Sequence, residues 1–372
     1  MPSLENIMQV AEALEKSPVI VIADRCVAVR NRKASCRKCL SACPAGAISV
    51  GLNEVAIDAT TCIGCGSCTS ACPTEALVYV KPTNAMIREA ALRSLRRNEG
   101  CAVIACARIS SKRQADPERF AEVPCFSRID EVLIVDLVAQ GADSVLLVDG
   151  NCATCKNRIS LQAAFTAVDQ AHALLQAHGN DIEITSITGF PEDMRAEDTS
   201  EMYGSSRRVF FSDAFGAAKD TAKTAAKTTI ENELGYKIDE RSIGERLRVG
   251  PDGKMPQLTV KRHETALNAL DAIGQPDSGA ISSRLFGTID INTAKCNVCG
   301  MCVTFCPTRA LLRDQPKNPS DRIRYFEFSA ADCVQCGLCK DVCWKCAITL
   351  SNEVDAAELY DFEPRIFKIG SE

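Results

Sequence analysis

The chain contains little histidine or tryptophan and lacks the features of several common protein classes. Among its 372 residues are 3 histidines and 1 tryptophan, and Lys+Arg 43 against Asp+Glu 48 gives a net charge of -5. That balance does not indicate nucleic-acid binding. No run approaches the roughly eighteen apolar residues of a membrane span. The N-terminal residues include no basic stretch, twin arginine or apolar segment, so we expect no signal peptide and a cytoplasmic location.

Motifs that bind phosphate or dinucleotides are also missing. No Gly-x-Gly-x-x-Gly follows a strand-like segment, and Gly250–Lys254 has neither the spacing nor the hydroxyl residue of a Walker loop. The sequence therefore shows no obvious place for two-electron substrate chemistry. Its length, with 46% apolar residues, is sufficient for two or three domains with hydrophobic cores.

Cysteine, in contrast, is abundant. The chain has 22 cysteines, which fall within 26–72, 101–155 and 296–346, and none lies within 156–295. In a reducing compartment so many thiols are not expected to form a disulfide framework. Their clustering favours metal ligation.

Three cysteine runs have the spacing Cys-x2-Cys-x2-Cys-x3-Cys that is typical of bacterial ferredoxins. Proline follows the last cysteine of two runs, and Trp344 takes its place in the third. Three closely spaced thiolates can face one cluster, whereas the fourth must come from elsewhere. These runs predict 4Fe-4S clusters; structural zinc, which usually needs a longer central gap and often histidine, is the alternative. The runs are Cys62, Cys65, Cys68 and Cys72; Cys296, Cys299, Cys302 and Cys306; and Cys333, Cys336, Cys339 and Cys343.

A fourth run is irregular. Cys36, Cys39 and Cys43 keep the second part of the motif, but the next cysteine upstream is Cys26. We interpret this as the same motif with an inserted loop; a degenerate half-site without its own cluster is the alternative. The surroundings are basic, and we hypothesise that positive charge raises the cluster potential here, with a solvated loop as the alternative. The cations are Arg30, Arg32, Lys33, Arg37 and Lys38.

Each pair of runs resembles a two-cluster bacterial ferredoxin, in which the fourth cysteine of one run ligates the cluster of the other. The resemblance implies four 4Fe-4S clusters and leaves Cys346 as a spare thiol or a replacement ligand. The implied ligand sets are Cys26, Cys36, Cys39 and Cys72; Cys43, Cys62, Cys65 and Cys68; Cys296, Cys299, Cys302 and Cys343; and Cys306, Cys333, Cys336 and Cys339.

The flanking sequence also indicates a duplicated ferredoxin-like module. Alternating residues predict a hairpin over 47–50 and 55–58, a closing strand over 76–80 and a corresponding strand over 322–328. We expect one module at 1–84 and the other at 286–372.

The region 85–190 has the pattern of a small α/β domain. A helix over 85–98 precedes strands over 101–106, 145–149 and 182–187, which alternate with helices over 129–140 and 157–178. This order predicts a parallel, flavodoxin-like sheet whose ligands lie at the carboxyl ends of the strands. Cysteines occur at those ends: Cys106, Cys125, Cys152 and Cys155.

Residues 101–156 resemble the delta subunit of methyl-viologen-reducing hydrogenases. The resemblance lies in 123–129, 141–148 and the pair Cys152 and Cys155; the family's first cysteine pair is reduced to Cys106, and its closing pair is wider than the pair here. It implies a 2Fe-2S cluster and electron transfer toward heterodisulfide reductase. We expect one further cluster at Cys106, Cys125, Cys152 and Cys155, with zinc or free thiols as alternatives.

The remaining part, 191–285, is predicted to be a linker and helical region. Residues 192–207 are polar, 212–234 have the pattern of a solvated charged helix, for which partner docking is the alternative, and 259–273 predict an amphipathic helix. The expected fold class is thus α+β and α/β multidomain.

These observations predict an electron-transfer subunit of a cytoplasmic oxidoreductase complex in an anaerobe, with hydrogenase, heterodisulfide-reductase-like or flavoprotein partners. Such a subunit conducts electrons and does not itself make or break substrate bonds. The alternative is an enzyme whose middle domain reduces a disulfide-like substrate at a labile cluster or at Cys152 and Cys155. A zinc-stapled scaffold and a redox sensor are further alternatives, and no sequence feature identifies the donor, acceptor or direction of flow.

Overall fold

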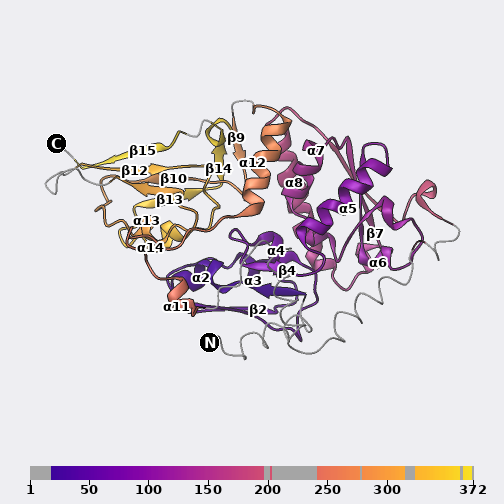
Figure 1. Ribbon diagram of the computed structural model, residues 1–372, viewed down its shortest axis with the longest axis horizontal. Coiled ribbons are helices and arrows are strands. Elements are labelled where there is room, and N and C mark those ends of the chain that lie inside the picture. The colour runs from indigo at the N-terminus through magenta and orange to yellow at the C-terminus, as the bar shows by residue number, and fades with distance from the viewer. Residues whose placement is uncertain are drawn as a thin grey trace.

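The computed structural model contains a central α/β domain and a cysteine-rich module formed by each end of the chain (Figure 1). The expected mixed fold class, with ferredoxin-type modules at both ends, is confirmed. In Figure 1 the C-terminal module lies at the left, the N-terminal module below the centre and the α/β domain at the right. The described residues are 18–196, 202, 241–276, 279–314, 323–360 and 363–370.

A parallel four-stranded sheet forms the core of the central domain. Its order is β6-β5-β7-β8, which corresponds to the flavodoxin-like order. The sequence pattern predicted three of these strands and missed the three-residue β6, which is too short for a periodic signal. The strands are β5 (Cys101–Cys106), β6 (Ala121–Val123), β7 (Ser144–Asp149) and β8 (Glu183–Thr188).

Helices cover this sheet near the positions that the sequence predicted. Thr83 caps α5 by accepting a hydrogen bond from the Met86 amide, and Asp130 caps α7 by accepting one from Leu133. The helices are α5 (Asn84–Arg97), α6 (Ala107–Ser110), α7 (Glu131–Ala139) and α8 (Leu161–Gln176), with short 3-10 turns η2 (Pro117–Arg119), η3 (Phe126–Arg128), η4 (Cys152–Thr154) and η5 (Arg158–Ser160).

The N-terminal module has the predicted hairpin, in which Ile48 pairs with Ile57. The closing strand β4 pairs with β1, a strand that the sequence reading did not predict. Short helices carry the cysteines. The elements are β1 (Val19–Val21), η1 (Ala23–Arg25), α2 (Val27–Arg30), α3 (Lys38–Ala42), β2 (Ile48–Gly51), β3 (Glu54–Ile57), α4 (Ser67–Ala71) and β4 (Leu77–Tyr79).

The C-terminal module repeats this plan with additional strands. Strand β10 pairs with β13, β9 pairs with β14, and β11, β12 and β15 form a three-stranded antiparallel sheet. The elements are β9 (Ala280–Ser282), β10 (Thr288–Ile291), α13 (Met301–Phe305), β11 (Leu311–Arg313), β12 (Arg324–Phe328), α14 (Leu338–Val342), β13 (Ile348–Ser351), β14 (Glu353–Asp355), η7 (Ala357–Leu359) and β15 (Arg365–Ile369).

The region between the central domain and the second module is only partly described. Helix α12 (Lys261–Ile273) confirms the predicted amphipathic helix and packs against α7. The predicted helix over 212–234 lies outside the described residues, as does most of the predicted linker over 192–207. Its described beginning contains η6 (Glu192–Met194), where Met194 is buried; farther along lies α11 (Ile243–Arg246). Among the described residues, every helix is too short or too polar to span a bilayer.

Candidate metal centres

The thiols of Cys26, Cys36, Cys39 and Cys72 lie together in the N-terminal module. Burial raises the pKa of Cys26 and of Cys36, and the neighbouring Cys72 thiolate raises it further. Burial and the thiolates of Cys72, Cys26 and Cys36 raise the pKa of Cys39 to about 12. The Ala76 amide donates a hydrogen bond to Cys72 Sγ at 3.2 Å. The structure therefore brings Cys26 to the other three thiols, although its position in the sequence is irregular.

A second set in the same module consists of Cys43, Cys62, Cys65 and Cys68. All four line one small cavity. Burial raises the pKa of Cys68, and the thiolates of the other three raise it further. The Ala47 amide donates to Cys43 Sγ at 3.4 Å. Each of the two sets thus contains one cysteine from the other run, as the ferredoxin resemblance implies.

The C-terminal module repeats this exchange. Burial, with a contribution from the Cys306 thiolate, raises the pKa of Cys333 to about 12. In the other set, Cys296, Cys299, Cys302 and Cys343 line a small cavity, and the Ala347 amide donates to Cys343 Sγ at 3.3 Å. Burial raises the pKa of Cys339, and the thiolates of Cys336, Cys333 and Cys306 raise it further. The set around Cys333 therefore consists of Cys306, Cys333, Cys336 and Cys339.

These four thiol groups fit iron–sulfur clusters. Buried thiols with raised pKa values are costly as free thiolates, and a positively charged metal core offsets that cost. Amide N–H groups directed at sulfur stabilise the charged ligands. No group of three Cys, His, Asp or Glu side chains in the described part of the chain is arranged to hold a single metal ion. A cubane instead requires thiolates that bind separate irons.

A glycine in the left-handed conformation directly precedes the cysteine-bearing helix of each regular run. Gly66 has φ +82°, and a Cβ placed there would lie 2.4 Å from Arg128 Cδ. Both the backbone and the close approach of Arg128 therefore require glycine. In the irregular run Arg37 precedes the helix with φ −134°, so this segment enters α3 along a different path.

The four middle-domain cysteines gather at the carboxyl edge of the parallel sheet. Burial, Asp149 and the thiolates of Cys106, Cys125 and Cys155 together raise the pKa of Cys152 to about 12. Cys125 Sγ lies 3.4 Å from Ser160 Oγ. The structure therefore groups these four residues at the edge where ligands of parallel α/β sheets bind.

The two remaining cysteines lie elsewhere. Cys101 begins β5 at the opposite end of the strand from Cys106 and is half-buried. Cys346 is exposed, and its amide donates to the Cys343 carbonyl at 2.9 Å. Neither thiol belongs to the four cysteine groups of the ferredoxin modules or to the group in the central domain.

The central-domain group adjoins the group around Cys65. The Cys125 thiolate raises the pKa of Cys65, in addition to its burial. Ser127, two residues after Cys125, donates to the Cys65 carbonyl at 3.1 Å and accepts at its own carbonyl from Ser70 Oγ at 3.0 Å. Turn η3 thus packs directly on helix α4 of the ferredoxin module.

The two ferredoxin modules also meet at their cysteines. The Cys36 thiolate contributes to the raised pKa of Cys336, after burial and the Cys306 thiolate. The Ser35 amide and hydroxyl donate to the Asp341 carboxylate at 2.6 and 2.8 Å. A small hydrophobic cluster joins the modules and consists of Val27, Ala28, Ala34, Leu338 and Val342. The sequence reading missed this contact because its partners are about three hundred residues apart.

The basic insertion is only partly a solvated loop. Arg32, Lys33 and Arg37 are exposed, as that reading expects. Arg30 is 5% exposed and donates to the Pro256 carbonyl, whereas Lys38 is half-buried and donates to the Gln335 carbonyl at 3.1 Å. Two of the five cations therefore lie within packed structure.

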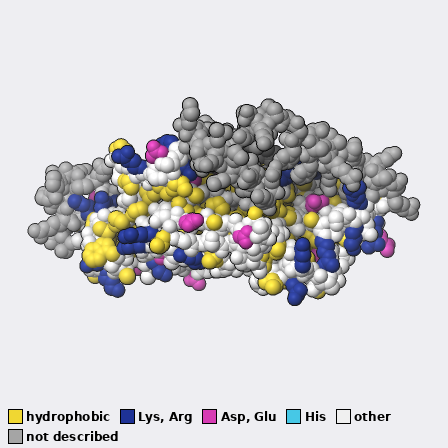
Figure 2. All heavy atoms as spheres, turned by 90° about the horizontal axis from the view of Figure 1, so that it is seen from below, with side chains coloured by type: hydrophobic (Ala, Val, Ile, Leu, Met, Phe, Trp, Pro, Cys, Tyr) yellow, Lys and Arg dark blue, Asp and Glu magenta, His cyan; other side chains and the backbone are white. Residues whose placement is uncertain are grey.

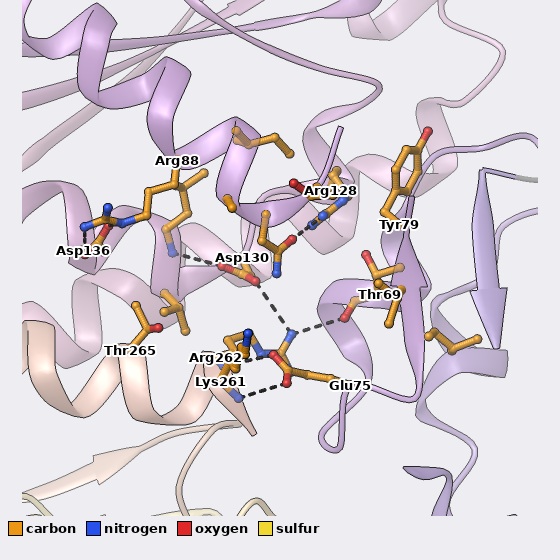
Figure 3. A pocket seen from close by; sticks show the side chains of 18 of the residues that line it. Thr69, Glu75, Tyr79, Arg88, Arg128, Asp130, Asp136, Lys261, Arg262 and Thr265 are labelled. Atoms are coloured by element: carbon orange, nitrogen blue, oxygen red, sulfur yellow. Dashed lines mark hydrogen bonds and ion pairs between the residues drawn. The ribbon is translucent and has the colours of Figure 1, made fainter. Parts of the chain in front are cut away.

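A larger cavity of about 550 Å³ lies where α4, α5, α7 and the start of α12 meet (Figure 3). Its lining contains no cysteine, and six of its charged residues form three pairs: Arg88 with Asp136 at 2.5 Å, Arg25 with Glu75 at 3.2 Å and Arg262 with Asp130 at 3.8 Å. Arg262 of α12 joins the parts, because it pairs with Asp130 of the central domain and donates to the Ser70 and Cys72 carbonyls of the N-terminal module. On the face shown in Figure 2, Lys and Arg side chains are spread along the molecule instead of forming one basic patch.

Comparison with known families agrees with this arrangement. Residues 25–76 and 295–347 each match the 4Fe-4S dicluster domain, and residues 97–202 match the methyl-viologen-reducing hydrogenase delta subunit. No curated protein matches the chain. Both resemblances expected from the sequence are thereby confirmed. The chain carries two 4Fe-4S dicluster domains, one on each side of a domain of the methyl-viologen-reducing hydrogenase delta subunit family.

Proposed function

We propose that this chain is an electron-transfer subunit that holds four 4Fe-4S clusters and one additional cluster. The iron–sulfur electron-transfer role rests on the matched domains. One observation above all supports the number of clusters. In each dicluster domain, each group of four thiols contains three cysteines of one run and one cysteine of the other run. A thiol group that needs residues from both runs is the arrangement that two adjacent cubanes require.

The proposed ligands are the four thiols of each group. An iron–sulfur cluster gains or loses one electron without any substrate bond being made or broken. The protein supplies the thiolates, directs backbone amides at sulfurs among them and buries or partly buries every proposed ligand except Cys299. These features set the potential and limit solvent rearrangement when the charge changes.

We further propose that the five groups form one series. Cys125 adjoins Cys65, the two groups of the N-terminal module share one core, and Cys36 adjoins Cys336. The order is the central-domain group, the Cys62 group, the Cys26 group, the Cys333 group and the Cys296 group. The ends of this series are the central domain and the Cys296 group, where Cys299 is exposed.

The additional cluster is assigned to Cys106, Cys125, Cys152 and Cys155. Its 2Fe-2S type is proposed from the delta-subunit resemblance. Burial and Asp149, which raise the pKa of Cys152 to about 12, make a reactive free thiolate unfavourable near neutral pH. That observation favours a ligand role over the alternative in which Cys152 and Cys155 reduce a disulfide-like substrate.

A series with two ends needs a redox partner at each end. We propose one-electron partners of the hydrogenase, heterodisulfide-reductase or flavoprotein kind, within a cytoplasmic complex. Near the Cys296 group, Trp344 is 56% exposed and Lys345 Nζ lies 4.1 Å from the centre of its ring. These residues supply an accessible apolar and basic surface beside that end of the series.

The order can be tested by EPR spectroscopy of the fully reduced chain, because reduced clusters that are neighbours interact magnetically. Cys39→Ser changes an inner group, so we expect loss of one cluster together with the magnetic interactions on both of its sides. Cys299→Ser changes an end group and should remove interactions on one side only. Equal spectral changes in the two variants would contradict the order, whereas a wild-type chain without iron and sulfide would contradict the cluster assignment itself.

A further inference from the structure

The junction of the two ferredoxin modules contains a cation between two cysteine groups. Lys38 begins helix α3 and lies between the ligand positions Cys36 and Cys39. Its ammonium group donates to the carbonyl of Gln335, which lies in the loop between Cys333 and Cys336. One side chain thus connects the cysteine loops of both modules.

The charge of Lys38 is directed toward thiolates of both groups. Burial lowers the pKa of Lys38, and its electrostatic interactions with Cys36, Cys336 and Cys72 oppose that effect. Conversely, Lys38 lowers the pKa of Cys36 and of Cys333, although burial leaves both raised overall. Two other cations lie nearby: Arg262 also lowers the pKa of Lys38, and Arg30 interacts with Cys336 and Cys306 and donates to backbone carbonyls of Asp24 and Pro256.

We propose that Lys38 is a positioning residue that sets the potentials of both junction clusters and holds the Cys36 loop against the Cys333 loop. This inference rests on the proposed function, because it requires clusters at the Cys26 and Cys333 groups. Reduction adds one negative charge to a cluster, and a nearby ammonium stabilises that charge. Partial burial limits screening by salt, so the effect is larger than for a solvated lysine.

The geometry distinguishes Lys38 from the other cations of the insertion. Arg32 and Lys33 are exposed, and neither is among the largest influences on the pKa of Cys26, Cys36 or Cys39. Arg37 is exposed and interacts with Cys36 of one module only. Lys38 alone among these four both interacts with Cys36 and donates to the facing module.

The test is an EPR-monitored redox titration of the full chain, purified anaerobically, in four variants. Lys38→Met removes the charge, Lys38→Gln removes the charge but keeps a donor for the Gln335 carbonyl, and Lys38→Arg keeps both. Lys33→Met is the matched control, since Lys33 is an exposed lysine of the same insertion. We expect both neutral variants to shift two of the four 4Fe-4S potentials to more negative values. Lys38→Arg and Lys33→Met should retain the wild-type potentials.

The result also separates this inference from the proposed function. Iron and sulfide are measured first, and a wild-type chain without them contradicts the proposed function. If the wild type and either neutral variant are fully loaded, potentials equal to those of Lys33→Met would overturn the role of Lys38. A shift of a single cluster, or an equal shift of all four, would overturn its shared position between two clusters.

Discussion

The two dicluster domains have the same plan but differ in the run that opens each domain. In the C-terminal domain, Cys296, Cys299 and Cys302 follow the regular spacing, and Cys299 is exposed. In the N-terminal domain, residues 27–35 separate Cys26 from Cys36, and the first four of them form helix α2 (Val27–Arg30), whose residues are all buried. The regular run thus has one exposed ligand position, whereas the insertion of the irregular run packs against the other module.

This difference shows what the insertion does. Val27 and Ala28 from α2 pack with Leu338 and Val342, and Ser35 binds Asp341. The segment that breaks the ferredoxin spacing is therefore the segment that binds the second ferredoxin. An irregular spacing that resembles a degenerate site in the sequence corresponds here to an interface that still delivers Cys26 to its group.

The largest effect is expected when the irregular run loses its distant ligand. Cys26→Ser should remove one complete cluster, or roughly four irons per chain. Cys346→Ser should retain the full iron content because Cys346 is exposed and is not one of the proposed ligands. Iron and acid-labile sulfide analysis measures both, and an unchanged iron content in Cys26→Ser would show that this run is a degenerate half-site.

Truncation of the interface core tests whether the insertion binds the second module. Leu338 is fully buried against the insertion, so Leu338→Ala should cost about 2–5 kcal/mol. Leu52→Ala, at a leucine that is 80% exposed, is the control and should change little. Anaerobic thermal unfolding measures the difference; equal melting temperatures for the two variants would contradict the proposed packing.

A pH dependence distinguishes the two contacts of α12. Arg262 donates to backbone carbonyls of the N-terminal module, whereas His263 Nε2 donates to the Ala331 carbonyl of the C-terminal module. Burial lowers the pKa of His263 from 6.5 to about 4. As the pH falls, the histidine takes up a proton at a higher pH in the unfolded chain than in the folded chain. The contribution of neutral, buried His263 to the free energy of unfolding is therefore present above pH 6.5 and is lost as the pH falls toward 4.

Between pH 6.5 and pH 4, the titration of His263 is expected to lower the free energy of unfolding by about 1.4 kcal/mol per pH unit. Unfolding at pH 7 and pH 5.5 should therefore show a larger loss for the wild type than for His263→Gln, which cannot take up the proton. The same pH dependence of unfolding in both proteins would show that protonation of His263 does not cause the loss of stability.

The smallest change concerns the polar contact of the insertion. Asp341→Ala removes the acceptor for the Ser35 amide and hydroxyl and should cost about 1–2 kcal/mol. Asp290→Ala, at an exposed aspartate of the same module, serves as its control. If both variants unfold at the same temperature, the Ser35–Asp341 contact does not stabilise the junction.

The sequence predicted those parts of the molecule that depend on local pattern. The parallel sheet and its cysteine-bearing edge follow from alternating strands and helices, and the hairpin at Ile48 follows from its residue alternation. Strand β6 and strand β1 have only three residues each, too few for a periodic signal.

The junction could not be predicted because it depends on long-range packing. The sequence gives no reason to prefer one of the five cations near the irregular run over another. From the sequence alone, substitution of Arg32 would test the hypothesis of a raised cluster potential as well as substitution of Lys38. Only the fold shows that Arg32 faces solvent while Lys38 contacts the facing module. Likewise, no local signal indicates that Ser35 meets Asp341.

The most direct test of the account is the content of iron, acid-labile sulfide and zinc in the anaerobically purified chain. Four cubanes predict about sixteen irons, and a 2Fe-2S cluster in the central domain raises this to about eighteen, with matching sulfide. Stoichiometric zinc with little sulfide would contradict the electron-transfer role of all five cysteine groups.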